Sequence, residues 1–166
     1  PRVAVYDRGG WQVQPLLPQG EFYGEFATYD VTLDVPRQHV VGATGVPVTG
    51  DPGWEAVNVN RNRPPAYRRD FYPAKPAESV GLLNRSSAAD RKRIRWRAEQ
   101  VHHFAWTSNP DYVYEGGTVG TTPVHALYLA GDTAWRGAAV ERTVKAMQFM
   151  ESVFGSYPWP QITNVH

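Results

Sequence analysis

Three observations predict a mostly β chain that finishes with a short α/β portion. Aromatic residues make up 13% of the 166 residues, and 15 glycines and 14 prolines supply many turns, a composition that favours sheets over long helices. Apolar and polar side chains alternate in several segments, which is typical of strands with one buried face. Helical spacing of apolar residues occurs in one segment, near the C-terminus. With 42% apolar residues, the chain is long enough to bury a hydrophobic core.

The most regular alternation lies between residues 29 and 35. We expect a strand there that buries Tyr29, Val31, Leu33 and Val35 on one face and exposes Asp30, Thr32 and Asp34 on the other. Pro36 ends this strand. Shorter strands are predicted at 39–43 and 54–59 (WEAVNV), on either side of a segment whose glycines and prolines indicate turns. Residues 23–59 are therefore expected to form antiparallel strands.

The middle of the chain combines a predicted loop with a second alternating strand. Residues 61–87 contain four prolines among polar and basic residues and show no period, which predicts a long surface loop. From residue 93 to residue 98, one face holds Ile94, Trp96 and Ala98, and the other holds Arg93, Arg95 and Arg97. We expect this strand to lead into VHHFAW, residues 101–106, which also reads as strand and stops at the turn signal of residues 109 and 110.

The spacing of apolar residues changes in the last part of the chain. Residues 123–130 (PVHALYLA) predict a buried strand, and a helix is predicted over 138–154. Asp132 or Thr133 is the candidate cap of this helix, and Gly155 followed by Pro158 is its stop. Its apolar positions recur at helical spacing, and we expect burial of Val140, Val144, Met147 and Phe154, with Met150 on the same stripe. The change predicts an all-β domain over 1–122 and the start of an α/β domain over 123–166.

Composition and charge exclude several classes of function. The 17 basic and 16 acidic residues nearly cancel, so the whole molecule has no field that would attract nucleic acid or an anionic membrane. The chain has no cysteine, which excludes disulfides, a thiolate nucleophile and a cysteine-based zinc finger, and is compatible with either the cytoplasm or an exported compartment. No apolar run approaches the ~20 residues of a membrane span.

The histidines do not form a recognisable metal motif. His102 and His103 are adjacent in an expected strand, where neighbouring side chains point to opposite faces, and His125 belongs to another strand. No H-E-x-x-H is present. We therefore expect structural histidines, and we assign no catalytic, cofactor-binding or metal-binding residue to this chain.

Three other patterns are read as structural. GATG (residues 42–45) and GGTVG (residues 116–120) lack phosphate-binding spacings and are predicted to be loops. No serine lies in a G-x-S-x-G context; the serines considered are Ser86, Ser87, Ser108 and Ser156. The basic cluster superficially resembles a nucleic-acid surface and comprises Arg91, Lys92, Arg93, Arg95 and Arg97. Trp96 alternates with these arginines and is expected in the core, so the cluster is predicted to be a solvated face or an interdomain salt-bridge surface.

Five phrases in series carry a family resemblance. They are PRVAVYD at the start, GEFYGEFATYDVTLDVP (20–36), VVGATG (40–45), VHHFAW (101–106) and FGSYPWP (154–160). In this order they resemble the N-terminal region of the zinc aminopeptidase family of gluzincins, which includes membrane alanyl aminopeptidases and leukotriene hydrolases. The phrases span nearly the whole chain.

The resemblance implies an N-terminal antiparallel β-sandwich, or saddle, that packs over a thermolysin-like catalytic domain. VHHFAW corresponds to a family phrase V-x-D-F-A-W, in which His103 takes the place of the aspartate, so no carboxylate role carries over. PVHALYLA and the following helix correspond to the entry of the catalytic domain. The family's H-E-x-x-H, its second glutamate ligand, its G-x-M-E-N loop and its later tyrosine have no counterpart in residues 1–166, and both ends of the chain look cut.

The resemblance leads to one main hypothesis and two alternatives. The chain would be the N-terminal fragment of a zinc-dependent aminopeptidase, where it scaffolds and walls the substrate cleft. Its partners would be the remainder of the catalytic domain and a peptide substrate, and the zinc would belong to the parent protein. The alternatives are a stand-alone β-sandwich that binds peptide or sugar through exposed Trp and Tyr, and an inactive paralogue. The C-terminal helix favours the main hypothesis over the binding module, because a self-contained sandwich does not need it.

Overall fold

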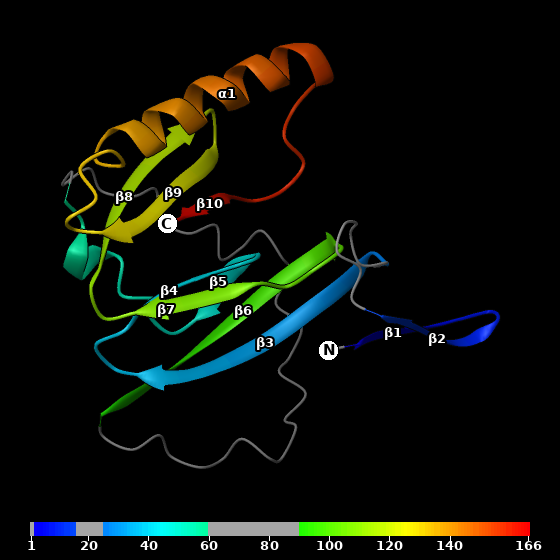
Figure 1. Ribbon diagram of the computed structural model, residues 1–166. Helices are drawn as coiled ribbons and strands as arrows, with labels where there is room; N and C mark the ends of the chain where they lie inside the picture. Colours follow the sequence, from blue (N-terminus) through cyan, green and yellow to red (C-terminus); the bar gives the residue numbers. More distant parts are fainter. Residues whose placement is uncertain (1, 16–24, 60–89) are drawn as a thin grey trace.

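The computed structural model describes residues 2–15, 25–59 and 90–166 (Figure 1). These residues form a mostly β fold with antiparallel sheets and one α-helix that follows nine of the strands, as the sequence predicts. The elements are β1 (Arg2–Asp7), β2 (Gly10–Pro15), β3 (Ala27–Pro36), β4 (Val40–Ala43), β5 (Val46–Thr49), the 3-10 turn η1 (Glu55–Val57), β6 (Arg91–Val101), β7 (Trp106–Asn109), β8 (Tyr112–Val119), β9 (Thr122–Leu129), α1 (Ala138–Phe154) and β10 (Ile162–Val165). The predicted loop over 61–87 lies outside the described residues.

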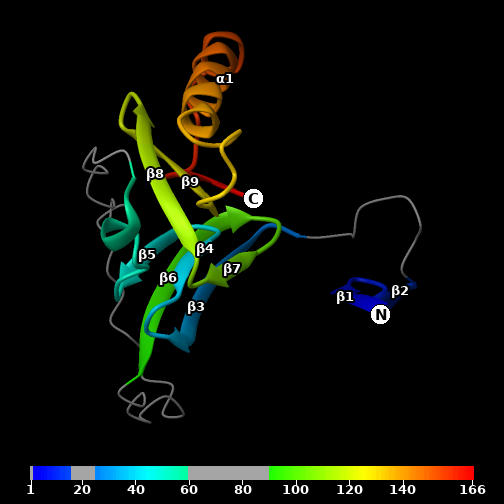
Figure 2. The ribbon, with the colours of Figure 1, turned by 60° about the vertical axis from the view of Figure 1, so that its left-hand side comes forward.

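The strands form small sheets that lie one above another. The described sheets have the orders β3-β6-β5, β4-β7 and β10-β9-β8, and β1 pairs with β2 as a hairpin. In Figure 1 the β8–β9–β10 sheet lies above the β4–β7 pair, which lies above β3 and β6, and Figure 2 shows the same order from another side. The hydrophobic core fills the space between these sheets.

The two predicted alternating strands pair with each other. β3 and β6 are antiparallel, with Leu33 opposite Ile94 and Val31 opposite Trp96. The inward side chains of both strands are buried or half-buried, whereas the aspartates of β3 are exposed. The predicted faces of residues 29–35 and 93–98 are therefore confirmed. Each face is set by strand geometry, because a slip of one residue would exchange core and solvent sides.

Residues 54–59 do not form the predicted strand. Trp54 is fully buried, its Nε1 donates to the Val41 carbonyl at 2.8 Å, and its ring stacks on Tyr114 with centroids 5.3 Å apart. The chain reaches this position through Gly53 in the left-handed region (φ 90°) and continues as η1. The strand-like pairing described for residues 54–59 is one isolated bridge, between Asn58 and Tyr114. The large ring is anchored in the core, and the backbone turns around it.

VHHFAW is not one strand either. β6 ends at Val101, just after Gln100 adopts a positive φ of 54°, and β7 begins at Trp106. His102 and His103 lie in the connection between the two strands. Gln100 lies at an irregularity in the pairing of β6 with β3, and Val101, opposite Ala27, is the last residue of β6 that pairs.

The glycines predicted to lie in loops are partly strand residues. Gly116 and Gly117 belong to β8, and Gly42 belongs to β4. A Cβ on Gly117 would lie 2.6 Å from Val140 Cγ1 of α1, and a Cβ on Gly42 would lie 2.6 Å from Leu127 Cδ1. Positions 117 and 42 need glycine because Val140 of α1 and Leu127 of β9 lie too close to the strand backbone for a side chain to fit.

The C-terminal elements form a parallel crossover. β8 and β9 are an antiparallel hairpin, and β10 pairs parallel with β9 after the chain returns through α1. A parallel pair requires such a crossover, and a helix is its usual form. The predicted strand over 123–130 and the helix over 138–154 are confirmed. The predicted domain boundary, between residues 122 and 123, falls after the first residue of β9, and the division into two domains stays a prediction.

The start of α1 differs from the prediction. Its cap residue is Gly137, whereas Asp132 and Thr133 lie in the preceding turns. The buried Glu115 carboxylate of β8 accepts the Gly137 N–H at 2.9 and 3.0 Å and the Tyr128 hydroxyl. A negative charge near a helix N-terminus is stabilising, and for α1 it comes from this carboxylate of β8.

The far end of α1 also differs from the prediction. Met147 is buried, and Val140 and Val144 pack beside it, but Phe154 is 76% exposed and Met150 is exposed too. Figure 1 shows the reason: the C-terminal half of α1 extends beyond the β8–β9 hairpin, so no sheet lies beneath it. Gly155 ends the helix as predicted. Within the described part of the chain, α1 is too short and too polar to cross a membrane, and no other helix qualifies.

Candidate functional site

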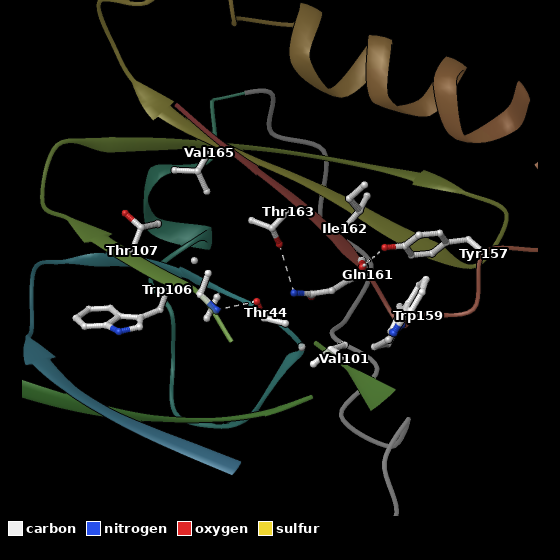
Figure 3. A pocket seen from close by; sticks show the side chains of 15 residues that line it. Thr44, Val101, Trp106, Thr107, Tyr157, Trp159, Gln161, Ile162, Thr163 and Val165 are labelled. Atoms are coloured by element: carbon white, nitrogen blue, oxygen red, sulfur yellow. Dashed lines mark hydrogen bonds between the residues drawn. The ribbon is translucent and has the colours of Figure 1, made fainter. Parts of the chain in front are cut away.

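A groove runs between the β4–β7 pair and the segment that ends in β10 (Figure 3). Its volume is about 550 Å³. One wall is formed by Gly42 to Gly45 and by Trp106 and Thr107 of β7. The opposite wall is formed by Tyr157, by residues 159–163 and by Val165. The groove therefore separates the antiparallel β4–β7 pair from the crossover unit.

Local backbone chemistry shapes the first wall. Gly45 has a φ of 82°, and a Cβ there would lie 2.1 Å from the Arg97 carbonyl oxygen, so the turn accepts only glycine without rearrangement. The Thr44 Oγ1 accepts the Ala105 N–H at 3.1 Å, which ties this turn to the start of β7. These two contacts define the main-chain path of the first wall.

The second wall is held by its own hydrogen bonds. The Tyr157 hydroxyl donates to the Gln161 carbonyl at 3.4 Å, and the Gln161 amide donates to Thr163 Oγ1 at 3.4 Å. Burial raises the pKa of Tyr157, so its hydroxyl stays protonated at neutral pH. β10 is an edge strand of its described sheet, with β9 on one side. Main-chain groups at such an edge can pair with an extended segment.

The described lining of the groove contains no charged side chain. Trp106 is 53% exposed at one end and Trp159 is 37% exposed at the other. Aromatic faces and an open strand edge suit an extended, mainly apolar chain segment, whereas general acid–base catalysis requires a titratable group near its working pKa. This groove can bind or wall a peptide, and its described residues supply no catalyst.

His125 lies in the core rather than in a site. It is fully buried in β9, its Nδ1 lies 2.8 Å from the Tyr114 hydroxyl, and its ring centroid lies 4.3 Å from that of Trp54. Its Nε2 makes no hydrogen bond of regular geometry with any described residue, although the Gln161 side chain acts to raise its pKa. Burial outweighs this effect and lowers the pKa to about 3, so the ring is neutral.

Of the other histidines, His102 and His103 lie side by side, and His166 makes separate contacts. His102 and His103 are exposed, and their rings stack with centroids 6.1 Å apart, contrary to the expectation of opposite faces. His166 Nδ1 pairs with Asp132 Oδ2 at 2.6 Å beside the Trp135 ring. Among residues 2–15, 25–59 and 90–166, no three His, Asp or Glu side chains are grouped so that they could hold a metal ion.

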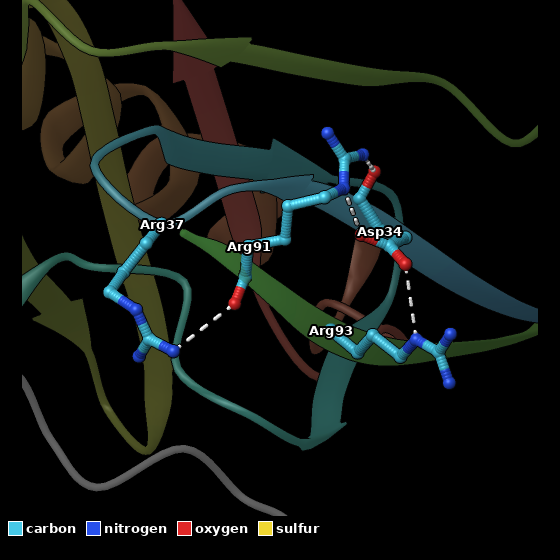
Figure 4. A network of polar contacts seen from close by, with 4 residues as sticks. All are labelled: Asp34, Arg37, Arg91 and Arg93. Carbon is cyan, nitrogen blue, oxygen red and sulfur yellow. Dashed lines mark hydrogen bonds and ion pairs between the residues drawn. The ribbon is translucent and has the colours of Figure 1, made fainter. Parts of the chain in front are cut away.

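The basic cluster of β6 is a row of ion pairs. Asp34 accepts from Arg91 and Arg93, as Figure 4 shows, and Asp30 accepts from Arg95. These arginine hydrogen bonds are the main reason that the pKa values of both aspartates are lowered. Trp96 is fully buried, as predicted. Of the two predicted alternatives, a solvated strand face describes Arg91, Arg93 and Arg95, which pair with the aspartates of β3. Arg97 is more buried and pairs with Glu99, and Lys92 lies on the other face of β6.

One of the serines considered, Ser108, lies beside a histidine. The Ser108 hydroxyl lies 3.1 Å from His39 Nδ1, a pair that β4–β7 pairing creates. In the described structure no carboxylate orients this His39 ring as a triad requires. Ser156 is exposed after α1, and Ser86 and Ser87 lie outside the described residues. Sequence reasoning could not find the groove or this pair, because both depend on pairing between distant segments.

Comparison with known proteins adds no family assignment: no family model and no curated protein matches the chain.

Proposed function

We propose that this chain is the N-terminal part of a zinc metallopeptidase of the aminopeptidase type, in which it scaffolds the catalytic domain and walls the substrate cleft. The observation that carries the proposal is the β9–α1–β10 crossover that follows the antiparallel sheets. A parallel β-α-β unit is the building block of an α/β domain and is not needed to complete a β-sandwich.

The uncovered end of α1 supports the same proposal. Phe149, Val153 and Phe154 are each more than half exposed on the last turns of the helix. Apolar side chains clustered in this way mark a surface that another part of a protein covers. In the proposed parent, the remainder of the catalytic domain covers this end of α1.

The uncharged groove suits a wall of a peptide cleft. Its aromatic rims and the edge of β10 fit a peptide in an extended conformation. The described side chains do not form a zinc ligand set, so the proposal places the zinc and its chemistry on residues outside this chain. The role that we assign to this chain is to scaffold the catalytic domain and to wall the substrate cleft, with no chemical step of its own.

One observation favours a second candidate function. Trp106 is 53% exposed beside the groove, which is the arrangement expected of a stand-alone module that binds peptide or sugar. Such a module would bind its ligand as the 166-residue chain alone. The proposed fragment would instead need the extended protein for activity.

The test compares the 166-residue chain with an extended protein that continues past His166. Metal analysis and an aminoacyl-anilide assay are run on both. We expect one zinc per chain and turnover in the extended protein, and neither in the 166-residue chain. Zinc or turnover in the short chain would overturn the proposal, and an extended protein without metal or activity would favour the inactive paralogue.

A further inference from the structure

Lys92 lies on the core side of β6. It precedes Ile94 by two residues, so strand alternation places it on the same face as Ile94, Trp96 and Ala98, which are fully buried. The residue opposite it in β3 is the buried Val35. Lysine is seldom placed at an inward position of a strand, because its ammonium loses hydration there. Packing alone therefore does not account for a lysine at this position.

The half-buried Lys92 side chain ends beside a glycine and not beside an acid. A Cβ on Gly53 would lie 3.0 Å from the Lys92 Nζ, so the glycine leaves the space that the nitrogen occupies. In the part of the chain that the structure describes, the Lys92 side chain makes no ion pair and no hydrogen bond. No carboxylate therefore blocks the nitrogen.

A cavity of about 400 Å³ opens at the same place, and we call it the Lys92 cavity. Gly53, which the Lys92 Nζ approaches, also lines this cavity, so the nitrogen lies at the cavity wall. The space is far larger than the ~30 Å³ of one water molecule, and it has room for a small organic molecule beside the nitrogen. The small or apolar residues of its lining are Val40, Gly50, Gly53, Ala56 and Val57.

The surroundings of Lys92 favour its neutral amine. Burial is the main cause that lowers the pKa of Lys92, the Asp51 carboxylate opposes this effect, and the Arg37 guanidinium adds to it. Asp51 does not reach ion-pair distance, and its Oδ1 accepts the Gly53 N–H at 2.8 Å. Desolvation and a neighbouring cation are the two means by which proteins make a lysine nucleophilic near neutral pH.

Two other titratable residues line the Lys92 cavity, and each has a partner elsewhere. The His39 Nδ1 lies 3.1 Å from the Ser108 hydroxyl. The Arg93 side chain lies on the opposite face of β6, where it pairs with Asp34 (Figure 4). Lys92 is therefore the nucleophile of this cavity.

We propose that Lys92 is a reactive amine that condenses with a small uncharged aldehyde in the Lys92 cavity and forms an imine. The ammonium first releases a proton to solvent, and the nitrogen lone pair then attacks the carbonyl carbon. A proton passes from the nitrogen to the carbonyl oxygen and gives a carbinolamine. The carbinolamine loses its hydroxyl group and the last nitrogen proton as water, which leaves a C=N bond. The sequence of steps needs no oxidant or reductant.

The lining of the cavity selects the class of aldehyde. Its apolar residues from β4 and η1, Val40, Ala56 and Val57, suit a short uncharged chain attached to the carbonyl group. The Lys92 cavity shares no lining residue with the groove beside β10, so the proposal is independent of the proposed peptidase function.

Reductive trapping with propanal and sodium cyanoborohydride tests the proposal on the 166-residue chain, because the reductant converts the imine into a stable secondary amine. Peptide mapping by mass spectrometry then measures the rate of alkylation at each lysine. The exposed Lys145 is the reference within the same chain, and Glu141→Gln removes its ion-pair partner so that this pair does not bias the comparison. At pH 7 we expect alkylation of Lys92 to be at least about fivefold faster than that of Lys145. Equal or slower alkylation of Lys92 would overturn the proposal.

Two further measurements attribute the reactivity to the folded cavity. In concentrated urea the two lysines should react at similar rates, and a difference that persisted there would overturn the role of the cavity. Asp51→Asn keeps an acceptor for the Gly53 N–H and removes the charge that raises the pKa of Lys92, so it should accelerate alkylation of Lys92 severalfold at pH 7. An unchanged or lower rate in this variant would overturn the proposal.

Lys92→Arg keeps the positive charge and removes the amine. This variant should lose the fast site and leave the rate at Lys145 unchanged, whereas a fast site that remained would overturn the proposal. If Lys92→Arg does not fold, the comparison of Lys92 with Lys145 in the unaltered chain decides.

Discussion

The Tyr114 hydroxyl and the His125 Nδ1 lie 2.8 Å apart in the core, across the β8–β9 hairpin. The two residues are fully buried, and the glycine between them in space makes their contact possible. Gly116 is the register partner of His125, and a Cβ on Gly116 would lie 2.5 Å from the Tyr114 Oη. A glycine in the middle of a strand is thus explained by the hydroxyl that occupies its side-chain space.

Gly116→Ala should destabilise the protein by about 1 to 3 kcal/mol, because the methyl group displaces the Tyr114 hydroxyl and leaves buried polar groups unpaired. Urea unfolding measures the change in free energy. Gly131→Ala is the matched control, since a Cβ at that turn meets no atom within 4 Å. Equal stability of the two variants would mean that the hydroxyl and the histidine do not depend on this glycine.

Stability should fall on acidification from pH 6.5 towards pH 4.5. His125 has a folded pKa of about 3 against an ordinary 6.5, so in this range the unfolded chain takes up a proton that the folded protein refuses. The free energy of unfolding then decreases with falling pH by at most about 1.4 kcal/mol per pH unit, and the effect is absent above pH 6.5. The lowered pKa values of Asp30 and Asp34 act at lower pH.

Urea unfolding at several pH values checks this slope. His125→Gln should flatten it, whatever that variant does to stability at pH 7.5. The control His102→Gln alters an exposed ring and should keep the slope. A slope that survives in His125→Gln would assign the titration to another group.

Met147→Asp should cost about 3 kcal/mol or more, because it places an unpaired carboxylate against β8 and β9. Phe149→Asp, two residues along on the exposed face, should change stability by no more than about 0.5 kcal/mol. Thermal unfolding distinguishes them. If Met147→Asp unfolded at the same temperature as the unaltered protein, α1 would not be packed on the hairpin.

Arg93, Arg95 and Arg97 should not confer nucleic-acid affinity. Each already pairs with a carboxylate of β3 or β6, and too few phosphates could be neutralised at once. Fluorescence anisotropy with a single-stranded oligonucleotide should show no binding at micromolar protein. A salt-sensitive complex that the triple arginine-to-glutamine variant loses would contradict this prediction.

The sequence alone determined the features that depend on near neighbours along the chain. The faces of β3 and β6, the buried strand β9 and the extent of α1 follow from periods of about two and about 3.6 residues, which the backbone of each element imposes. The stop at Gly155 likewise needs only local chemistry. The same alternation that places Trp96 in the core predicts a solvated face for the row of arginines.

The tertiary structure decided what depends on a distant partner. Trp54 is held in the core because it donates to the Val41 carbonyl and stacks on Tyr114. Gly116 and Gly117 lie in a strand because β8 pairs with β9, and they are glycine because Tyr114 and Val140 occupy the space of a side chain there. Phe154 is exposed because the C-terminal half of α1 extends beyond the hairpin. The groove beside β10 arises between segments that are distant along the chain, and periodicity within one segment carries no information about which segment lies opposite.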